Sequence, residues 1–179
     1  MKINKKLKKI VITGPESTGK TTLIDYLSEK FSMPYYYEFA REYIENLNRE
    51  YTFEDVENIA KKQISILKKS NYSVNEKCVF FDTGLIITKV WFQEVFNRVP
   101  FYVEEAIKEI KIDLYLLCYP DIKWVPDAVR ENGGEKRLSL FNKYKEELEK
   151  NSFKYLIIKG YERERFLSAQ EYLSSAYCL

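Results

Sequence analysis

Short apolar runs alternate with amphipathic segments along the whole chain. Runs of β-branched and aromatic residues predict buried strands at 7–13, 33–38, 78–82, 113–118 and 153–158. Apolar residues spaced three and four apart predict helices at 23–31, 39–47, 53–70, 85–96, 103–110, 138–150 and 162–176. Strands that alternate with helices predict an α/β fold in three layers, with a five-stranded, mostly parallel sheet between helices.

The turn after the first strand carries the clearest chemical signal. Positions 14–22 have the sequence Gly-Pro-Glu-Ser-Thr-Gly-Lys-Thr-Thr, which fits G-x-x-x-x-G-K-[ST], the phosphate-binding loop (P-loop). Backbone N–H groups and the helix N-terminus favour phosphate here, Lys20 is expected to reach the β- and γ-phosphates, and Thr21 to help hold Mg²⁺. A glycine turn that binds nothing is the alternative. The expected ATP-binding residues are Gly14, Glu16, Ser17, Thr18, Gly19, Lys20, Thr21 and Thr22.

Two acids stand where predicted strands end, at the edge of the sheet that the P-loop also occupies. Asp82 is the expected Mg²⁺ carboxylate opposite Thr21, and Glu38 is expected to orient or deprotonate the hydroxyl of a phosphoryl acceptor. Each acid could instead cap the helix that follows it. Arg41 lies one helical turn after Glu38 and could pair with it or contact a phosphate.

A lid is expected at about 120–137, where prolines, glycines and charges gather. Arg130 and Arg137 could neutralise charge on the transferring phosphoryl group as the lid closes; the alternative is solvation and pairing with nearby glutamates. Trp124 and Tyr37 could stack on a planar base, or serve as a lid anchor and as core packing, respectively. The expected catalytic residues are Lys20, Glu38, Asp82, Arg130 and Arg137.

Composition narrows the class of protein. With 179 residues, one domain over 1–179 is expected, and a net charge of +2 is too small to argue for nucleic acid or a membrane as partner. No histidine is present, which excludes histidine bases and histidine metal sites. Cys78 and Cys118 lie in apolar runs, so buried thiols and a cytoplasmic location are expected. A homo-oligomer is possible.

Absent motifs exclude several classes of P-loop protein. The chain lacks N-K-x-D, because Asn142-Lys143 is followed by Tyr144 and Lys145, and Asp82-Thr83-Gly84 does not match D-x-x-G, so a GTPase is disfavoured. A transporter ATPase signature is missing as well, and the chain is short for a ring-forming mechanoenzyme. A small-molecule kinase with a helical lid on the P-loop NTPase fold agrees best with these observations.

Several segments together resemble the kinase half of the NadR-type ribosylnicotinamide kinase family. They occur in the family's order, at residues 14–22, 37–43, 81–83, 113–117 and 124–130. The resemblance implies ATP- and Mg²⁺-dependent phosphorylation of the ribose 5′-hydroxyl of nicotinamide riboside, giving nicotinamide mononucleotide for NAD salvage. It also implies that Tyr37 stacks on nicotinamide, and that Glu38 and Asp82 are the ribose-side and magnesium-side acids. In the same family Trp124, Asp127 and Arg130 fall in the lid segment, and Arg137 matches the arginine that opens the next helix. The expected substrate-binding residues are Tyr37, Glu38, Arg41, Asp82, Trp124 and Asp127.

Two departures from that family limit the resemblance. Gly84 stands where the family usually has another acid, and no counterpart of the adenylyltransferase half is found, so the second salvage step is not expected on this chain. Two alternatives stay open. One is a kinase for another nucleoside or a vitamin alcohol such as thiamine, and the other is an ATP-binding regulatory ATPase that phosphorylates no acceptor.

Overall fold

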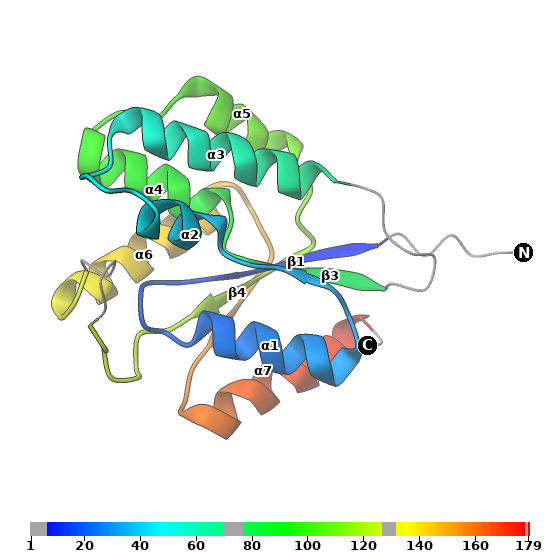
Figure 1. Ribbon diagram of the computed structural model, residues 1–179. Helices are drawn as coiled ribbons and strands as arrows, with labels where there is room; N and C mark the ends of the chain where they lie inside the picture. Colours follow the sequence, from blue (N-terminus) through cyan, green and yellow to red (C-terminus); the bar gives the residue numbers. More distant parts are fainter. Residues whose placement is uncertain (1–6, 70–76, 127–131, 178) are drawn as a thin grey trace, which may run out of the picture.

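A five-stranded parallel sheet lies at the centre of the computed structural model, which describes residues 7–69, 77–126, 132–177 and 179 (Figure 1). The strands run in the order β2-β3-β1-β4-β5, and every strand pair is parallel. They are β1 (Lys8–Thr13), β2 (Tyr35–Tyr36), β3 (Cys78–Asp82), β4 (Leu114–Cys118) and β5 (Tyr155–Ile158). The predicted fold class is therefore confirmed.

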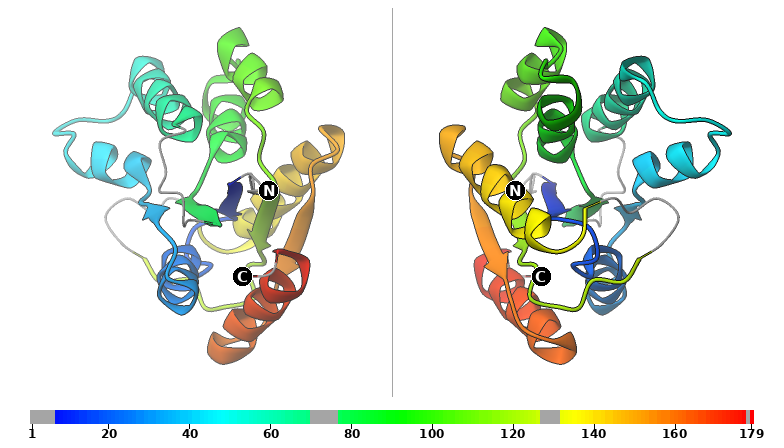
Figure 2. Two further views of the ribbon diagram at one scale, coloured as in Figure 1. Left: turned by 90° about the vertical axis from the view of Figure 1, so that its right-hand side faces the viewer. Right: turned by 90° about the vertical axis from the view of Figure 1, so that its left-hand side faces the viewer.

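Helices cover both faces of the sheet, as the two further views in Figure 2 also show. Helices α1 (Lys20–Phe31) and α7 (Glu162–Tyr177) pack on one face. The other face carries α3 (Phe53–Lys68), α4 (Leu85–Phe96), α5 (Phe101–Glu109) and α6 (Glu135–Lys150), with the short α2 (Phe39–Glu45) beside α3. Among the described residues, no helix combines the length and the apolar character that crossing a membrane requires.

The central strands are buried on both faces, which explains their continuous apolar sequence. All residues of β3 and β4 are buried, and alternate side chains enter the two hydrophobic cores. Cys78 and Cys118 both lie in the core below α1 and α7 and form no disulfide. Burial raises the pKa of the Cys78 thiol to about 12 and that of Cys118 to about 11. The expectation of two buried thiols is confirmed.

Several element boundaries differ from those expected. Strand β2 is limited to two residues, because it is an edge strand that pairs only with Phe80 and Phe81 before the chain turns into α2. Helix α5 starts at Phe101, directly after Pro100, whose fixed φ suits a helix start. Helix α6 starts at Glu135, which places Arg137 in its first turn and not in the preceding loop. In the segment expected to form the lid, residues 120–126 and 132–134 have irregular backbone.

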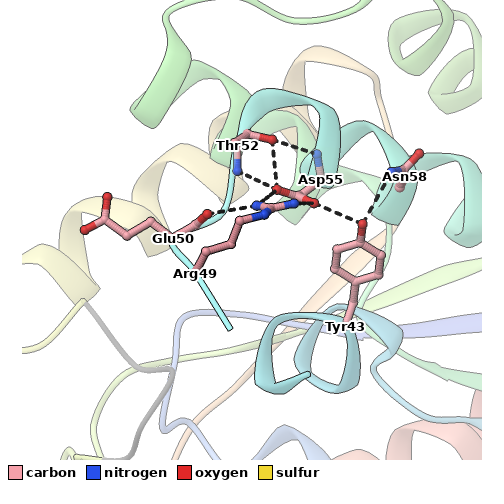
Figure 3. Close-up of polar contacts among 6 residues, drawn as sticks. All are labelled: Tyr43, Arg49, Glu50, Thr52, Asp55 and Asn58. Atoms are coloured by element: carbon pink, nitrogen blue, oxygen red, sulfur yellow. Dashed lines mark hydrogen bonds and ion pairs between the residues drawn. The ribbon is translucent and has the colours of Figure 1, made fainter. Parts of the chain in front are cut away.

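A polar network fixes the start of α3 against α2 (Figure 3). Thr52 and Asp55 form a capping box, and Arg49 binds both carboxylate oxygens of Asp55 through its two terminal nitrogens. Tyr43 of α2 donates a 3.0 Å hydrogen bond to the same carboxylate. Arg49 holds the pKa of Asp55 well below its usual range, and the Thr52 backbone N–H adds to this effect. The network thus holds α2, which begins directly after Glu38.

Candidate active site

The P-loop passes closely over the end of β4. Gly14 has φ +143°, and a Cβ atom at this position would lie 2.6 Å from the carbonyl oxygen of Cys118. Gly19, with φ +72°, precedes the first residue of α1. These two positions require glycine, because one has no room for a side chain and both have backbone conformations that L-residues rarely adopt. The loop therefore keeps its N–H groups close to the N-terminus of α1.

Two side chains of the P-loop donate hydrogen bonds to the backbone of the loop itself. Lys20 Nζ donates to the carbonyl oxygen of Pro15 at 3.0 Å, and Thr18 Oγ1 donates to the same oxygen at 2.8 Å. Lys20 thus lies folded over the loop, where phosphate oxygens could replace the carbonyl as its partner. Thr22 lies in the first turn of α1 with an exposed side chain. The contacts of these residues with a nucleotide stay predictions.

Asp82 meets the P-loop at the end of β3. Thr21 Oγ1 donates to Asp82 Oδ2 at 2.7 Å. Asp82 Oδ1 is buried and has no hydrogen-bond partner among the residues that the structure describes. Burial raises the pKa of Asp82, while the charge of Lys20 and the bond from Thr21 act in the opposite direction. The sequence-based prediction placed Thr21 and Asp82 together, and the structure does so.

These oxygen atoms are suited to Mg²⁺, which prefers hard oxygen ligands. A carboxylate oxygen without a partner and an adjacent hydroxyl offer two such ligands. Within the described part of the chain, no group of three or more His, Cys, Asp or Glu side chains could hold a metal ion. A magnesium ion held by Asp82 and Thr21 would therefore take further ligands from phosphate and water, as it commonly does.

Glu38 is the residue immediately before α2, and it lies close enough to the P-loop for the charge of Lys20 to act on it. Burial raises its pKa, and Asp82 and Glu16 contribute to the rise, whereas the positive charges of Lys20 and Arg41 lower it. Its side chain makes no capping hydrogen bond to α2. The alternative role as a helix cap is therefore not realised in the structure. Glu38 is instead a carboxylate in an electrostatic cluster with the P-loop.

A pocket with aromatic walls lies next to this cluster. It is lined by Tyr36, Tyr37, Phe39, Gln63, Ile66, Leu67, Phe81, Asp82 and Thr83. Tyr37 is 69% exposed, so it is not ordinary core packing, and its ring meets that of Tyr35 edge-on with centroids 4.6 Å apart. The ring of Tyr37 is thus accessible to a planar ligand. Gln63, a buried polar residue of α3, was not singled out from the sequence, because a glutamine among helical polar residues gives no signal.

The described parts of the expected lid are held against the P-loop. Asn132 donates to Glu16 twice, from its backbone nitrogen at 2.9 Å and from its side-chain amide at 2.8 Å. Ser17 Oγ accepts from the Val125 nitrogen at 3.0 Å. Glu16 and Ser17, expected to bind ATP, thus have side chains that contact the expected lid.

Two further lid residues can be placed. Arg137 is buried and donates to the carbonyl oxygens of Ile122 and Ser17, each at 2.9 Å. Surface solvation, the alternative for Arg137, is therefore wrong. Trp124 packs against Gly133, where an added Cβ would lie 3.3 Å from the indole ring, in agreement with a lid anchor. Arg130 and Asp127 lie outside the described residues, and their expected roles stay predictions.

Arg41 and Gly84 can also be placed in the structure. Arg41 Nε lies 2.9 Å from Glu45 on the next turn of α2, and its charge also acts on Glu38. Gly84 has extended backbone, and a Cβ there would lie 3.1 Å from a methyl group of the buried Val11. An acid at position 84 would therefore require Val11 to shift.

One buried arginine near the P-loop was missed. Arg165 of α7 donates to the carbonyl oxygens of Thr18, Tyr119 and Gly160 and forms an ion pair with Asp121. It belongs to the charged stretch at the start of α7, where a solvent-exposed position is the usual expectation. Only the tertiary structure shows that it lies beneath the P-loop.

Two curated relatives are similar to most of the chain. The trifunctional NAD biosynthesis/regulator protein NadR of Salmonella typhimurium and that of Escherichia coli are each 26% identical to it over 170 residues. The alignment covers 90% of this chain and 41% of each relative, so the chain spans less than half the length of these proteins.

Solved structures of other proteins are similar to this chain as well. The crystal structure of NadR protein in complex with NR is 25% identical, with a TM-score of 0.84 over 97% of this chain and 52% of that chain. Deoxyadenosine kinase from M. mycoides, at 17% identity, matches 93% of this chain and 99% of its own with a TM-score of 0.65, a likeness of fold alone. The resemblance to the NadR-type kinases is thereby confirmed.

The sequence also matches a model of a protein family. The model described as AAA domain (AAA_28) matches residues 9–165, a range that contains the P-loop, Glu38, Asp82 and Arg137. The chain therefore belongs to the AAA domain family (AAA_28) of P-loop proteins.

Proposed function

We propose that the protein is an ATP- and Mg²⁺-dependent kinase that phosphorylates the ribose 5′-hydroxyl of nicotinamide riboside and so forms nicotinamide mononucleotide for NAD biosynthesis. The observation that carries the proposal is one arrangement: the P-loop, Glu38 and Asp82 lie around a common point in a chain that matches the NadR protein solved with NR along 97% of its length. Similarity to the two NadR relatives supports the same reaction.

The donor half of the site is the P-loop and the start of α1. Loop N–H groups and the helix N-terminus bind the triphosphate, and Lys20 exchanges the Pro15 carbonyl for phosphate oxygens. Mg²⁺, held by Asp82 and Thr21, would neutralise charge between the β- and γ-phosphates when bound. In the same proposal Arg130 faces the phosphates from the lid, and Arg137 of α6 joins it when it exchanges the Ile122 and Ser17 carbonyl oxygens for phosphate oxygens.

In this proposal the acceptor half lies along the exposed ring of Tyr37, between Glu38 and the aromatic residues next to Asp82. Tyr37 offers its exposed ring to the pyridine ring of nicotinamide, and the ribose extends toward Glu38 and Asp82. Trp124, Asp127 and Arg41 border this side in the proposal. The exposed ring of Tyr37 is suited to a planar base, and the Glu38 carboxylate that follows it in the chain is suited to a sugar hydroxyl.

The reaction follows from these positions. The 5′-hydroxyl oxygen attacks the γ-phosphorus in line, its proton passes to the Glu38 carboxylate, and the bond from the γ-phosphorus to the bridging oxygen breaks so that ADP leaves. Because its pKa is raised, Glu38 is a stronger base than an exposed glutamate, yet Lys20 and Arg41 favour its ionised form. Lid contacts from Glu16 and Ser17 exclude water from the transfer.

The cytoplasm is the proposed location. Cys78 and Cys118 are buried thiols without a disulfide, which agrees with a reducing compartment.

Acceptor identity is tested by incubating the protein with Mg-ATP and a panel of nicotinamide riboside, common nucleosides and thiamine, with products identified by mass spectrometry. Nicotinamide mononucleotide is the expected product. Phosphorylation of a different acceptor in its place would refute the proposed substrate, and ATP hydrolysis without any phosphorylated acceptor would indicate a regulatory ATPase.

Glu38→Gln tests the chemistry directly. Loss of the base should lower the transfer rate by about 10²-fold or more, while ATP binding is retained. Glu42→Gln, an exposed position of the same helix, is the matched control and should transfer at the normal rate. Normal transfer by the Glu38 variant would remove the base from the proposal.

A further inference from the structure

Two consecutive carbonyl groups of the P-loop are held from outside the loop by arginines. Arg137 Nη2 donates to the Ser17 carbonyl oxygen at 2.9 Å, and Arg165 Nη1 donates to the Thr18 carbonyl oxygen at 3.1 Å. The two arginines come from different helices, α6 and α7, on opposite faces of the sheet. Only the first of them belongs to the expected lid.

Because a peptide unit is planar, an arginine that fixes the direction of a carbonyl group also fixes the direction of the following N–H group. In a trans peptide unit the C=O and the following N–H point in opposite directions, and the described part of the chain has no cis peptide bond. A Thr18 carbonyl fixed toward Arg165 therefore directs the Gly19 N–H away from Arg165. Gly19 at φ +72° has the freedom to rotate that peptide unit if it were not held.

We propose that Arg165 is a positioning residue for the donor triphosphate, which it affects by fixing the Thr18–Gly19 peptide so that the Gly19 N–H points at phosphate. Arg165 does not touch the nucleotide in this proposal. It acts through the loop backbone, and the expected consequence is an effect on triphosphate binding that is separate from its effect on folding.

Burial, hydrogen bonds and an ion pair hold the Arg165 side chain in place. Its side chain is 2% exposed, and its remaining donors bind the Tyr119 and Gly160 carbonyl oxygens and the Asp121 carboxylate. Asp121 Oδ2 in turn accepts from the Gly160 nitrogen at 2.7 Å. The loops after β4 and β5 are thus tied to the P-loop through one guanidinium, whose planar fork has the several fixed donors that this geometry needs.

The inference rests on the donor half of the proposed function, and its test needs no acceptor. Binding of inorganic tripolyphosphate and of Mg-ATP is measured by calorimetry for the unsubstituted protein and for Arg165→Met. One charge-assisted amide contact to phosphate corresponds to about 10- to 100-fold in Kd, so the variant should bind tripolyphosphate more weakly by that factor. The KM for the acceptor should stay unchanged.

Arg49→Met is the control, because it also removes an arginine that is paired with an aspartate, but at the start of α3 (Figure 3). It should retain the tripolyphosphate Kd of the unsubstituted protein. Arg165→Lys provides a second variant in case the methionine variant does not fold: it keeps the charge but has no fork, so its Kd should still rise.

The outcomes separate the two proposals. If folded Arg165 variants bind tripolyphosphate as tightly as the unsubstituted protein, Arg165 has only a structural role and the inference is refuted. If the unsubstituted protein itself does not bind tripolyphosphate or Mg-ATP, the donor half of the proposed function fails, and the inference fails with it. Weaker binding by the Arg165 variants alone, with the Arg49 control normal, supports the positioning role.

Discussion

Gly14→Ala is the substitution for which the structure gives the clearest magnitude. The new Cβ would lie 2.6 Å from the Cys118 carbonyl oxygen, a distance that real Cβ contacts essentially never show. That oxygen belongs to the backbone of a buried central strand, so it cannot move aside as the end of a flexible side chain could. The residue would also have to adopt φ +143°.

The cost has three parts. Backbone strain at such a φ contributes roughly 1–3 kcal/mol. Forcing a methyl group into a filled space contributes about 1–3 kcal/mol more. The smaller entropy of an unfolded chain with alanine offsets about 0.4–1 kcal/mol. We therefore expect Gly14→Ala to lower the free energy of unfolding by about 1–5.5 kcal/mol, which corresponds to a Tm roughly 2–22 °C lower in a domain of this size.

Comparison with Gly134→Ala separates the free-energy cost of the steric clash from that of the backbone strain. Gly134 also has a positive φ, +58°, but a Cβ there meets nothing within 4 Å. Urea unfolding of both variants should therefore show a smaller loss for Gly134→Ala, at most about 2.5 kcal/mol. Folded Gly14→Ala should also bind Mg-ATP more weakly, because the loop must move away from β4. Equal stability of the two variants would refute the argument from close contact.

Other substitutions test separate parts of the structure. Thr52→Ala removes the cap of α3 and should cost about 1 kcal/mol in urea unfolding, whereas Thr52→Ser should cost little. Lys89→Met leaves Glu147 buried without its 2.7 Å partner on α4, and should cost about 3–5 kcal/mol; a further Glu147→Leu change should recover part of the loss. If Glu38 is the base, as proposed, turnover requires its ionised form, so kcat should fall as pH drops through its raised pKa. Because the positive charge of Arg41 lowers that pKa, Arg41→Met should move the acidic limb of the pH profile to higher pH; an unmoved limb, or a move to lower pH, would contradict the assignment.

Local patterns in the sequence were sufficient to predict the sheet and the meeting of Thr21 with Asp82. The P-loop motif, the apolar run before Asp82 and the alternation of strands and helices predicted the sheet and placed Thr21 beside Asp82. This succeeded because parallel strands deliver their carboxyl ends to one edge, so acids at those ends gather without any knowledge of tertiary contacts.

Contacts between distant segments could not be predicted in the same way. Arg165 and Thr18 are 147 positions apart, and the pairing of Asn132 with Glu16 joins positions 116 apart. Such bonds depend on how loops pack after the sheet has formed, and polar residues in loops and charged helix starts have no periodicity that would reveal them. The short β2 has a related cause, because the extent of an edge strand depends on its one neighbour and not on its own sequence.

The two buried cysteines provide a built-in reporter of local opening. A thiol reagent can modify Cys78 or Cys118 only when β3 or β4, respectively, is transiently exposed. The carbonyl group of Cys118 lies beneath Gly14, so the modification rate of this thiol follows the motion of the strand end that supports the P-loop. Peptide mapping separates the cysteines, and a bound nucleotide should protect Cys118 more strongly than Cys78. The protein thus carries its own site-resolved probe of how ligand binding stabilises the sheet.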